Sequence, residues 1–122
     1  MTKEEFERIV QEEVDALPGQ YSELDNVRVI VEDEPSARTI GKMGMNNTSM
    51  LLGLYEGIPR PHRGTAYGMY PVVPDTITLF RHNIIKVGKT PGGIREQIKD
   101  TLIHEIGHYF GLSELEIRNA GY

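Results

Sequence analysis

Two histidines near the C-terminus, with a glutamate directly after the first, are the residues best suited to chemistry. They form the pattern H-E-x-x-H at His104, Glu105 and His108. On a helix the two histidines project from one face, with β-carbons about 5–6 Å apart, so both imidazoles can reach one zinc ion. Glu105 is turned by about 100° and is predicted to act as a general base rather than as a ligand. Bound zinc lowers the pKa of water towards about 7, and the glutamate accepts the proton as that water attacks a carbonyl carbon.

Glu114 is the leading candidate for the third zinc ligand. In the pattern H-E-x-x-H-x-x-G-x-x-H of metzincins, the glycine ends the helix and the final residue returns to the metal. Gly111 takes the glycine position here, and Glu114 takes the final position with an oxygen ligand that zinc accepts. Ser113 and Glu116 form a capping-box pattern, which gives Glu116 a structural role. Glu116 or an upstream histidine remains an alternative ligand, whereas a distant helix has little room because eleven residues follow Gly111.

Other residues able to do chemistry have no assigned role. The remaining histidines lie in a loop rich in proline and glycine and near the end of a strand segment, where a surface position is favoured over a hydrogen-bond donor to a transition state. These undetermined candidates are His62, His82, Arg81, Tyr67 and Tyr70.

The C-terminal helix that must carry the motif is strongly indicated. Apolar residues recur at successive i, i+4 positions from 94 to 110, at Ile94, Ile98, Leu102 and Ile106. The same periodicity places the two histidines on the flank of this apolar stripe, near Gln97 and Thr101. Residues 90–93 are interpreted as a turn before this helix, and residues 113–121 as a short helix after Gly111.

The preceding segments alternate between strand and loop patterns. An amphipathic helix is predicted over residues 3–17, because apolar residues recur at helical spacing until Pro18-Gly19. Alternating or β-branched runs predict three strands, at residues 27–32, 50–56 and 77–85, the last with a break at His82-Asn83. Polar connections are predicted for residues 33–50 and, with several prolines and glycines, for residues 57–75.

Composition bounds the remaining possibilities. The 122 residues are expected to form one domain, residues 1–122, with no cysteine available as a zinc ligand. A net charge of −5 with scattered Lys and Arg argues against a nucleic-acid partner. The sequence has no apolar run of about 18 residues and no signal-peptide core, so no membrane segment and a cytoplasmic location are predicted. Oligomeric state stays undetermined.

Three segments together resemble the small zincin-like metallopeptidases of bacteria: LLGLYEGIPR at 51–60, DTITLFRHNII at 75–85 and HEIGHYFGLSELEI at 104–117. The resemblance implies an α+β zincin-like fold in which the metal helix packs under a small twisted sheet. It also implies one Zn²⁺ per chain, bound by His104, His108 and Glu114, with Glu105 as the base. In that family the position of Glu114 is commonly an acid, often aspartate.

Departures from the larger metzincins affect substrate recognition. No methionine follows His108 in the 122 residues, and no C-terminal subdomain is expected to form a wall of the cleft. An extended peptide typically pairs with an exposed edge strand in zincins. Either ITLFRHNII or LLGLYE would be that edge here, with residues 57–74 as the rim.

The leading hypothesis is a zinc-dependent hydrolase, a peptidase acting on an extended peptide or protein segment. An alternative is a metal-stabilised peptide- or protein-binding module with little or no catalysis. A third interpretation treats the C-terminal helices as packing elements without metal, and predicts a change within about 0.5 kcal/mol for His104→Ala.

Overall fold

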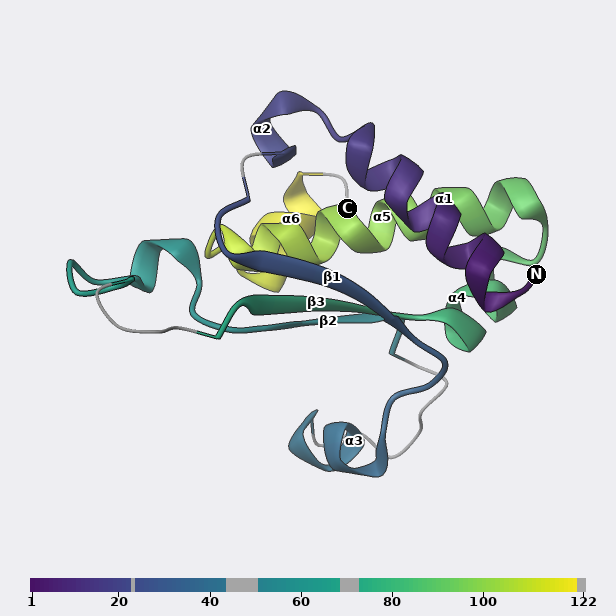
Figure 1. Cartoon of the computed structure of the whole chain (residues 1–122), viewed down its shortest axis with the longest axis horizontal. Helices are drawn as coiled ribbons and strands as arrows, with labels where there is room; N and C mark the ends of the chain where they lie inside the picture. Colours follow the sequence, from purple (N-terminus) through teal and green to yellow (C-terminus); the bar gives the residue numbers. More distant parts are fainter. Residues whose placement is uncertain (23, 44–50, 69–72, 121–122) are drawn as a thin grey trace.

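A three-stranded mixed sheet forms the middle of the fold (Figure 1). The computed structural model describes residues 1–22, 24–43, 51–68 and 73–120. The strand order is β1-β3-β2, and β3 runs parallel to β1 and antiparallel to β2. The strands are β1 (Val27–Glu32), β2 (Gly53–Glu56) and β3 (Asp75–Phe80). The sequence leaves two segments as candidates for the edge strand. The segment that contains β2 is at the edge, as predicted, whereas the segment that contains β3 is central, so that alternative is wrong.

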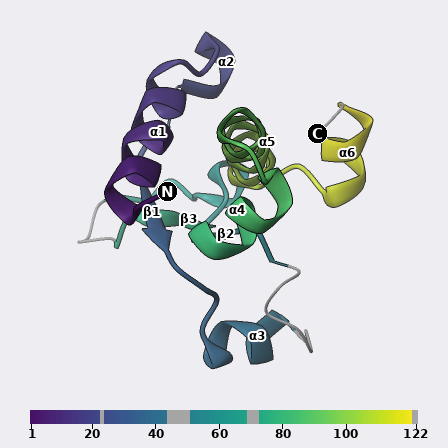
Figure 2. The same cartoon turned by 90° about the vertical axis from the view of Figure 1, so that its right-hand side faces the viewer.

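Most helices gather on one face of the sheet, which makes the architecture α+β. Figures 1 and 2 show α1 and α5 over this face, α6 beyond α5, and α3 on the opposite face. The helices are α1 (Lys3–Asp15), α2 (Gly19–Ser22), α3 (Ala37–Met43), α4 (Arg81–Gly88), α5 (Pro91–Tyr109) and α6 (Glu114–Asn119), with a 3₁₀ turn, η2 (Arg60–His62). Among the described residues, no helix is long and apolar enough to cross a membrane.

The hydrophobic core lies between the sheet and helices α1 and α5. Alternate residues of each strand point to the same face, and helical residues three or four apart form one stripe, so these patterns meet in one layer. Each fully buried aliphatic or aromatic side chain contributes roughly 1.5–3 kcal/mol. The core residues are Phe6, Ile9, Val10, Ile77, Leu79, Ile84, Ile94, Ile98, Leu102 and Ile106. The apolar stripe predicted for the motif helix is therefore confirmed.

Helix α1 begins and β1 extends close to where the sequence predicts. Thr2 caps α1, because its side chain accepts a hydrogen bond from the Glu5 amide at 3.1 Å. The acidic residues in the first turn also stabilise the helix, because their negative charge interacts favourably with the helix dipole. The helix ends two residues before the predicted position 17, and β1 matches the predicted strand 27–32.

Three predictions on local structure are wrong. The strand predicted for residues 77–85 ends at Phe80, and the chain continues as helix α4. The predicted connection 33–50 contains α3, whose first turn is stabilised by the Thr39 amide donating to Ser36 Oγ at 3.1 Å. Residues 90–93 are the start of α5, with Thr90 as the cap and Pro91 in the first turn, where its missing N–H costs nothing.

Candidate metal centre

Helix α5 presents the H-E-x-x-H residues on the flank of its buried stripe. The His104 and His108 side chains are 26% and 27% exposed, and their rings lie 5.2 Å apart between centroids. Glu105 is 8% exposed. Candidate ligand atoms of His104, Glu105 and His108 all lie within 4.8 Å of one another. The sequence spacing therefore produces a compact group of donors at the protein surface.

The chain turns back towards this group immediately after α5. Gly111 has a φ of +85°, a left-handed conformation that favours glycine. The Leu112 amide donates to Gly107 O at 3.0 Å and the Gly111 amide to His108 O at 2.9 Å, which is the Schellman pattern of a helix end. Gly107 lets the next helix pack closely, because a Cβ there would lie 2.8 Å from Cγ1 of Ile117.

Helix α6 begins directly after the Gly111 turn, and Glu114 is its first residue. Ser113 and Glu116 form the predicted capping box, with the Glu116 amide 3.2 Å from Ser113 Oγ and the Ser113 amide 3.1 Å from Glu116 Oε1. Oε1 of Glu114 lies 2.9 Å from Nε2 of His104 and 2.7 Å from Nε2 of His108. Glu114 rather than Glu116 thus meets the two imidazoles.

The contacts of His108 are compatible with a cation between its ring and Glu114. Its Nδ1 lies 3.2 Å from the carbonyl oxygen of Leu112, which can accept a hydrogen bond from an Nδ1–H. With the proton on Nδ1, the Nε2 lone pair faces the Glu114 carboxylate, 2.7 Å away. Two acceptors this close require a proton or a cation between them. Two imidazole nitrogens and one carboxylate oxygen are a ligand set that zinc accepts, and a hydrogen bond from Nδ1 to the Leu112 carbonyl would leave Nε2 free to bind it.

The two carboxylates of the site sit in different environments. Burial raises the pKa of Glu105 above its ordinary value, against the opposing effect of the two imidazoles. Partial burial also disfavours the charged form of Glu114, but hydrogen bonds to His104 and His108 outweigh it and lower the pKa of Glu114. Glu105 is therefore the stronger proton acceptor, and Glu114 is the more readily ionised.

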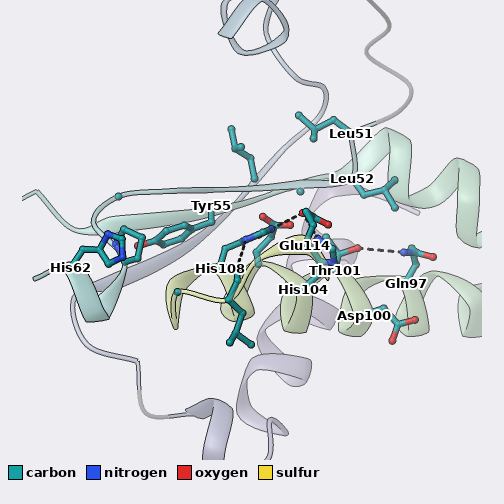
Figure 3. Close-up of a pocket in the computed structure, with 17 residues that line it drawn as sticks. Leu51, Leu52, Tyr55, His62, Gln97, Asp100, Thr101, His104, His108 and Glu114 are labelled. Carbon is teal, nitrogen blue, oxygen red and sulfur yellow. Dashed lines mark hydrogen bonds and ion pairs between the residues drawn. The ribbon is translucent and has the colours of Figure 1, made fainter. Parts of the chain in front are cut away.

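A cleft of about 920 Å³ runs between β2 and α5, past the histidines (Figure 3). Figure 3 places His62 at one end, Leu52 and Gln97 at the other, and Glu114 with the two histidines between them. The cleft is lined by Leu51, Leu52, Gly53, Leu54 and Tyr55 on the strand side and by Gln97, Asp100, Thr101, His104, Glu105 and His108 on the helix side. The 57–74 segment contributes part of the rim through Gly57, Pro59 and His62.

Strand β2 approaches the metal helix closely because Gly53 has no side chain. A Cβ on Gly53 would lie 2.6 Å from Cγ2 of Thr101 and 3.4 Å from Cγ of Glu105. This close approach covers Glu105 from the strand side and accounts for its burial. Glycine within a strand often marks such a contact between backbone and neighbour.

The other candidates from the sequence lie in different places. His62 lines the cleft, whereas His82 is at the surface beside Glu34, with 3.3 Å between Nδ1 and Oε1.

Arg81 donates to Asp33 and to the carbonyl of Met1, away from the cleft. The Tyr67 hydroxyl accepts a hydrogen bond from Asn26, and Tyr70 falls outside the described residues.

Sequence reasoning missed a buried polar group beside the cleft. Asp75 is 3% exposed, and its carboxylate pairs with Arg63, at 2.8 Å between Oδ2 and Nη2, and with the Tyr55 hydroxyl. Burial and this hydrogen bond raise the pKa of Tyr55. An acid directly after a proline at the start of an apolar strand was the available signal for Asp75, but nothing in the spacing pairs it with Arg63.

Comparison with known proteins gives one family. The family model described as zincin-like metallopeptidase matches residues 24–122. No curated protein matches the chain. The matched range includes the whole sheet, helix α5 and the Glu114 segment.

Proposed function

The chain belongs to the zincin-like metallopeptidase family, and on that premise we propose that it is a zinc-dependent peptidase. Its zinc ligands are His104, His108 and Glu114, and its general base is Glu105. The convergence of one Glu114 oxygen on both imidazole nitrogens, within 2.9 Å, carries the proposal. The expected stoichiometry is one Zn²⁺ per chain.

The three ligands come from two elements that fold locally. His104 and His108 are one turn apart on α5, and the Schellman turn at Gly111 brings Glu114 back to them. Zinc bound to them would supply Lewis-acid polarisation of a substrate carbonyl and a water acidified to a pKa of about 7. The Leu112 carbonyl holds His108 in the tautomer that leaves Nε2 for the metal.

Glu105 supplies the proton transfer. Its carboxylate lies beside the imidazoles but is buried under β2, and burial raises its pKa. A higher pKa makes a carboxylate a better acceptor for the proton of the attacking water, and the protonated acid can then donate to the departing amine. The closely packed Gly53 and Thr101 hold Glu105 in this position.

The lining of the cleft favours a particular substrate chemistry. Edge strand β2 runs along the cleft, and an extended peptide can add to such an edge through main-chain hydrogen bonds. The leucines of residues 51–54 offer apolar contacts. The Asp100 carboxylate has no hydrogen-bond or ion-pair partner among the described residues, and those that line the cleft include no lysine or arginine. The proposed substrate is therefore an extended segment with apolar side chains and a cationic side chain near Asp100.

Glu105→Gln is the test of this function. The variant is expected to keep zinc within severalfold of native affinity and to lose cleavage of a diverse unfolded-peptide mixture by at least about 10³-fold. Glu96→Gln, an exposed glutamate of the same helix, is the matched control and should cleave like the native chain. Cleavage that persists in Glu105→Gln would contradict the mechanism. Stoichiometric zinc and peptide binding without cleavage by the native chain would instead identify a binding module.

A further inference from the structure

Arg63 is a buried cation at the end of the rim segment, defined here as residues 57–63. Its side chain is 6% exposed. The guanidinium donates from Nε to Ile58 O at 3.0 Å, from Nη1 to Asp25 O at 2.8 Å and from Nη2 to Asp75 Oδ2 at 2.8 Å. One side chain therefore ties the rim segment to itself, to the residues before β1 and to the first residue of β3.

Asp75 completes this connection from the sheet. Besides Arg63, its carboxylate accepts hydrogen bonds from the Tyr55 hydroxyl and from the Ile58 amide, the latter at 3.2 Å. Gly57 leaves the room that the carboxylate occupies, because a Cβ on Gly57 would overlap the Asp75 side chain. Both ends of the rim segment are thus fixed on one buried carboxylate.

The same cation also reaches the end of the metal helix. Its guanidinium carbon lies 4.4 Å from the ring centroid of Tyr67 and 5.1 Å from that of Tyr109, within the range of cation–π attraction. Tyr109 directly follows His108 and is fully buried. Its hydroxyl donates to Asp25 O at 3.2 Å and accepts from the Asp25 amide at 3.0 Å.

The rim segment packs against the Gly111 turn, which leads to Glu114. Pro61 packs against Gly111 so closely that a Cβ on Gly111 would lie 2.9 Å from Cγ of Pro61. Rim residues Pro59 and His62 line the cleft together with Gly111 and Glu114. Movement of the rim would therefore change both one end of the cleft and the backing of the third ligand.

We propose that Arg63 is a positioning residue: anchored on Asp75, it holds the rim segment against the Gly111 turn and so fixes the place of Glu114 relative to His104 and His108. This inference rests on the proposed metal-binding function for its effect on zinc. Its effect on the Gly111 turn does not need zinc. Arg63 acts through Pro61 and the helix end, and its hydrogen bonds and ring contacts do not include His104, His108 or Glu114.

Arg63→Met and Arg63→Lys test the proposal beside Arg81→Met. Arg81 is a matched control, because it is a partly buried arginine, 16% exposed, paired with Asp33 at 2.9 Å but away from the cleft. The first readout is hydrogen exchange of the Gly111 and Leu112 amides in the metal-free chain, since both donate in the turn. The second is zinc affinity by chelator competition, with both measured well below the unfolding temperature.

We expect Arg63→Met to speed exchange at Gly111 and Leu112 by about tenfold or more, because local opening follows lost support. Zinc affinity should fall by about tenfold, the lower end for residues that orient ligands. Arg63→Lys, which keeps the charge but loses the fork, should lie between native and Arg63→Met. Arg81→Met should leave both readouts within about twofold of native.

Faster exchange at Ile58 with native exchange at Gly111 and Leu112 would overturn the proposal, because Arg63 would then order the rim alone. Equal effects of Arg63→Met and Arg81→Met would also overturn it. If Arg63→Met does not fold, Arg63→Lys against Arg81→Lys decides by the same criteria. Should the native chain bind no zinc, the function in the preceding subsection fails, while the exchange comparison still tests the positioning role.

Discussion

Gly53 on strand β2 faces Thr101 on helix α5 at a distance that leaves no room for a methyl group. A Cβ at Gly53 would lie 2.6 Å from Cγ2 of Thr101. This contact brings the edge strand onto the helix that carries the histidines. It sets the width of the cleft and the burial of Glu105.

Gly53→Ala should therefore lower the free energy of unfolding by roughly 1–3 kcal/mol, the usual cost of overpacking. Thr101→Ser removes the methyl group that the new Cβ meets and keeps the hydroxyl that accepts from Gln97. Urea denaturation of both single variants and the double variant measures their coupling. The double variant should recover most of the loss, and strictly additive losses would contradict the contact.

Gly111→Ala and Gly68→Ala separate backbone strain from lost space. Both glycines have positive φ, +85° and +83°, but Gly111 faces Pro61 whereas nothing lies within 4 Å of a Cβ on Gly68. Strain costs each variant about 1–2 kcal/mol, and Gly111→Ala should lose at least about 1 kcal/mol more. Thermal or urea unfolding compares them. Zinc affinity should weaken only in Gly111→Ala, and equal behaviour of the pair would show that the Pro61 contact is unimportant.

The stability of the metal-free chain should depend on Glu105 with a definite sign. Burial raises the pKa of Glu105 in the folded state, so ionised Glu105 lowers the free energy of unfolding at neutral pH. This penalty disappears once the pH falls below the unfolded value of about 4.3, where both states bind the proton. Glu105→Gln should be more stable than the native chain at about pH 7, and the gain should shrink towards pH 4.

Urea denaturation across this pH range is the measurement for Glu105→Gln, with Glu96→Gln as the exposed control on the same helix. The control should differ from native by less than about 0.5 kcal/mol at each pH. If the stability gained by Glu105→Gln grew as the pH fell, the raised pKa of the buried Glu105 carboxyl would be refuted.

Peptide selectivity should depend on Asp100. With Asp100→Asn, the preference for a peptide with one lysine over its neutral counterpart should fall by up to about fivefold, equivalent to about 1 kcal/mol for a partly exposed ion pair. Fluorescence anisotropy with Glu105→Gln as the background avoids cleavage during the measurement. As a control, Glu96→Gln is introduced into the same Glu105→Gln background. It should preserve the preference for the lysine peptide, since Glu96 does not line the cleft. If the Asp100→Asn variant kept the same preference for the lysine peptide, Asp100 would have no role in substrate recognition.

The sequence predicts well those parts of the fold that local patterns determine. The apolar stripe of α5 and the alternation of β1 are visible as short periodic patterns, and the capping box at Ser113 and Glu116 forms within one turn. The local rules predict that Glu114 returns towards the two histidines, because the helix period and the Gly111 turn set the direction of the chain. The metal-binding role of these three residues stays a prediction.

Predictions fail where distant contacts decide the structure. Ile84 and Ile85 fit a strand pattern, but the chain leaves the sheet after Phe80, where the Arg81 side chain binds Asp33 and the Met1 carbonyl. These partners are far away in sequence. Arg63 and Asp75 likewise meet only in the folded chain. Thr90-Pro91 is a different case, since a cap followed by proline is itself a helix-start signal, and the turn predicted for residues 90–93 disregards it.

Zinc binding by two charge-neutralised variants tests the central claim most directly. Glu114→Gln and Glu116→Gln each remove one negative charge from the first turn of α6, and glutamine preserves the capping box at position 116. Equilibrium dialysis followed by metal analysis should find about one zinc per chain in the native protein and in Glu116→Gln. Glu114→Gln should bind at least about tenfold more weakly. Equal zinc binding by Glu114→Gln and the native chain, or no zinc in the native chain at saturating metal, would contradict the proposed centre.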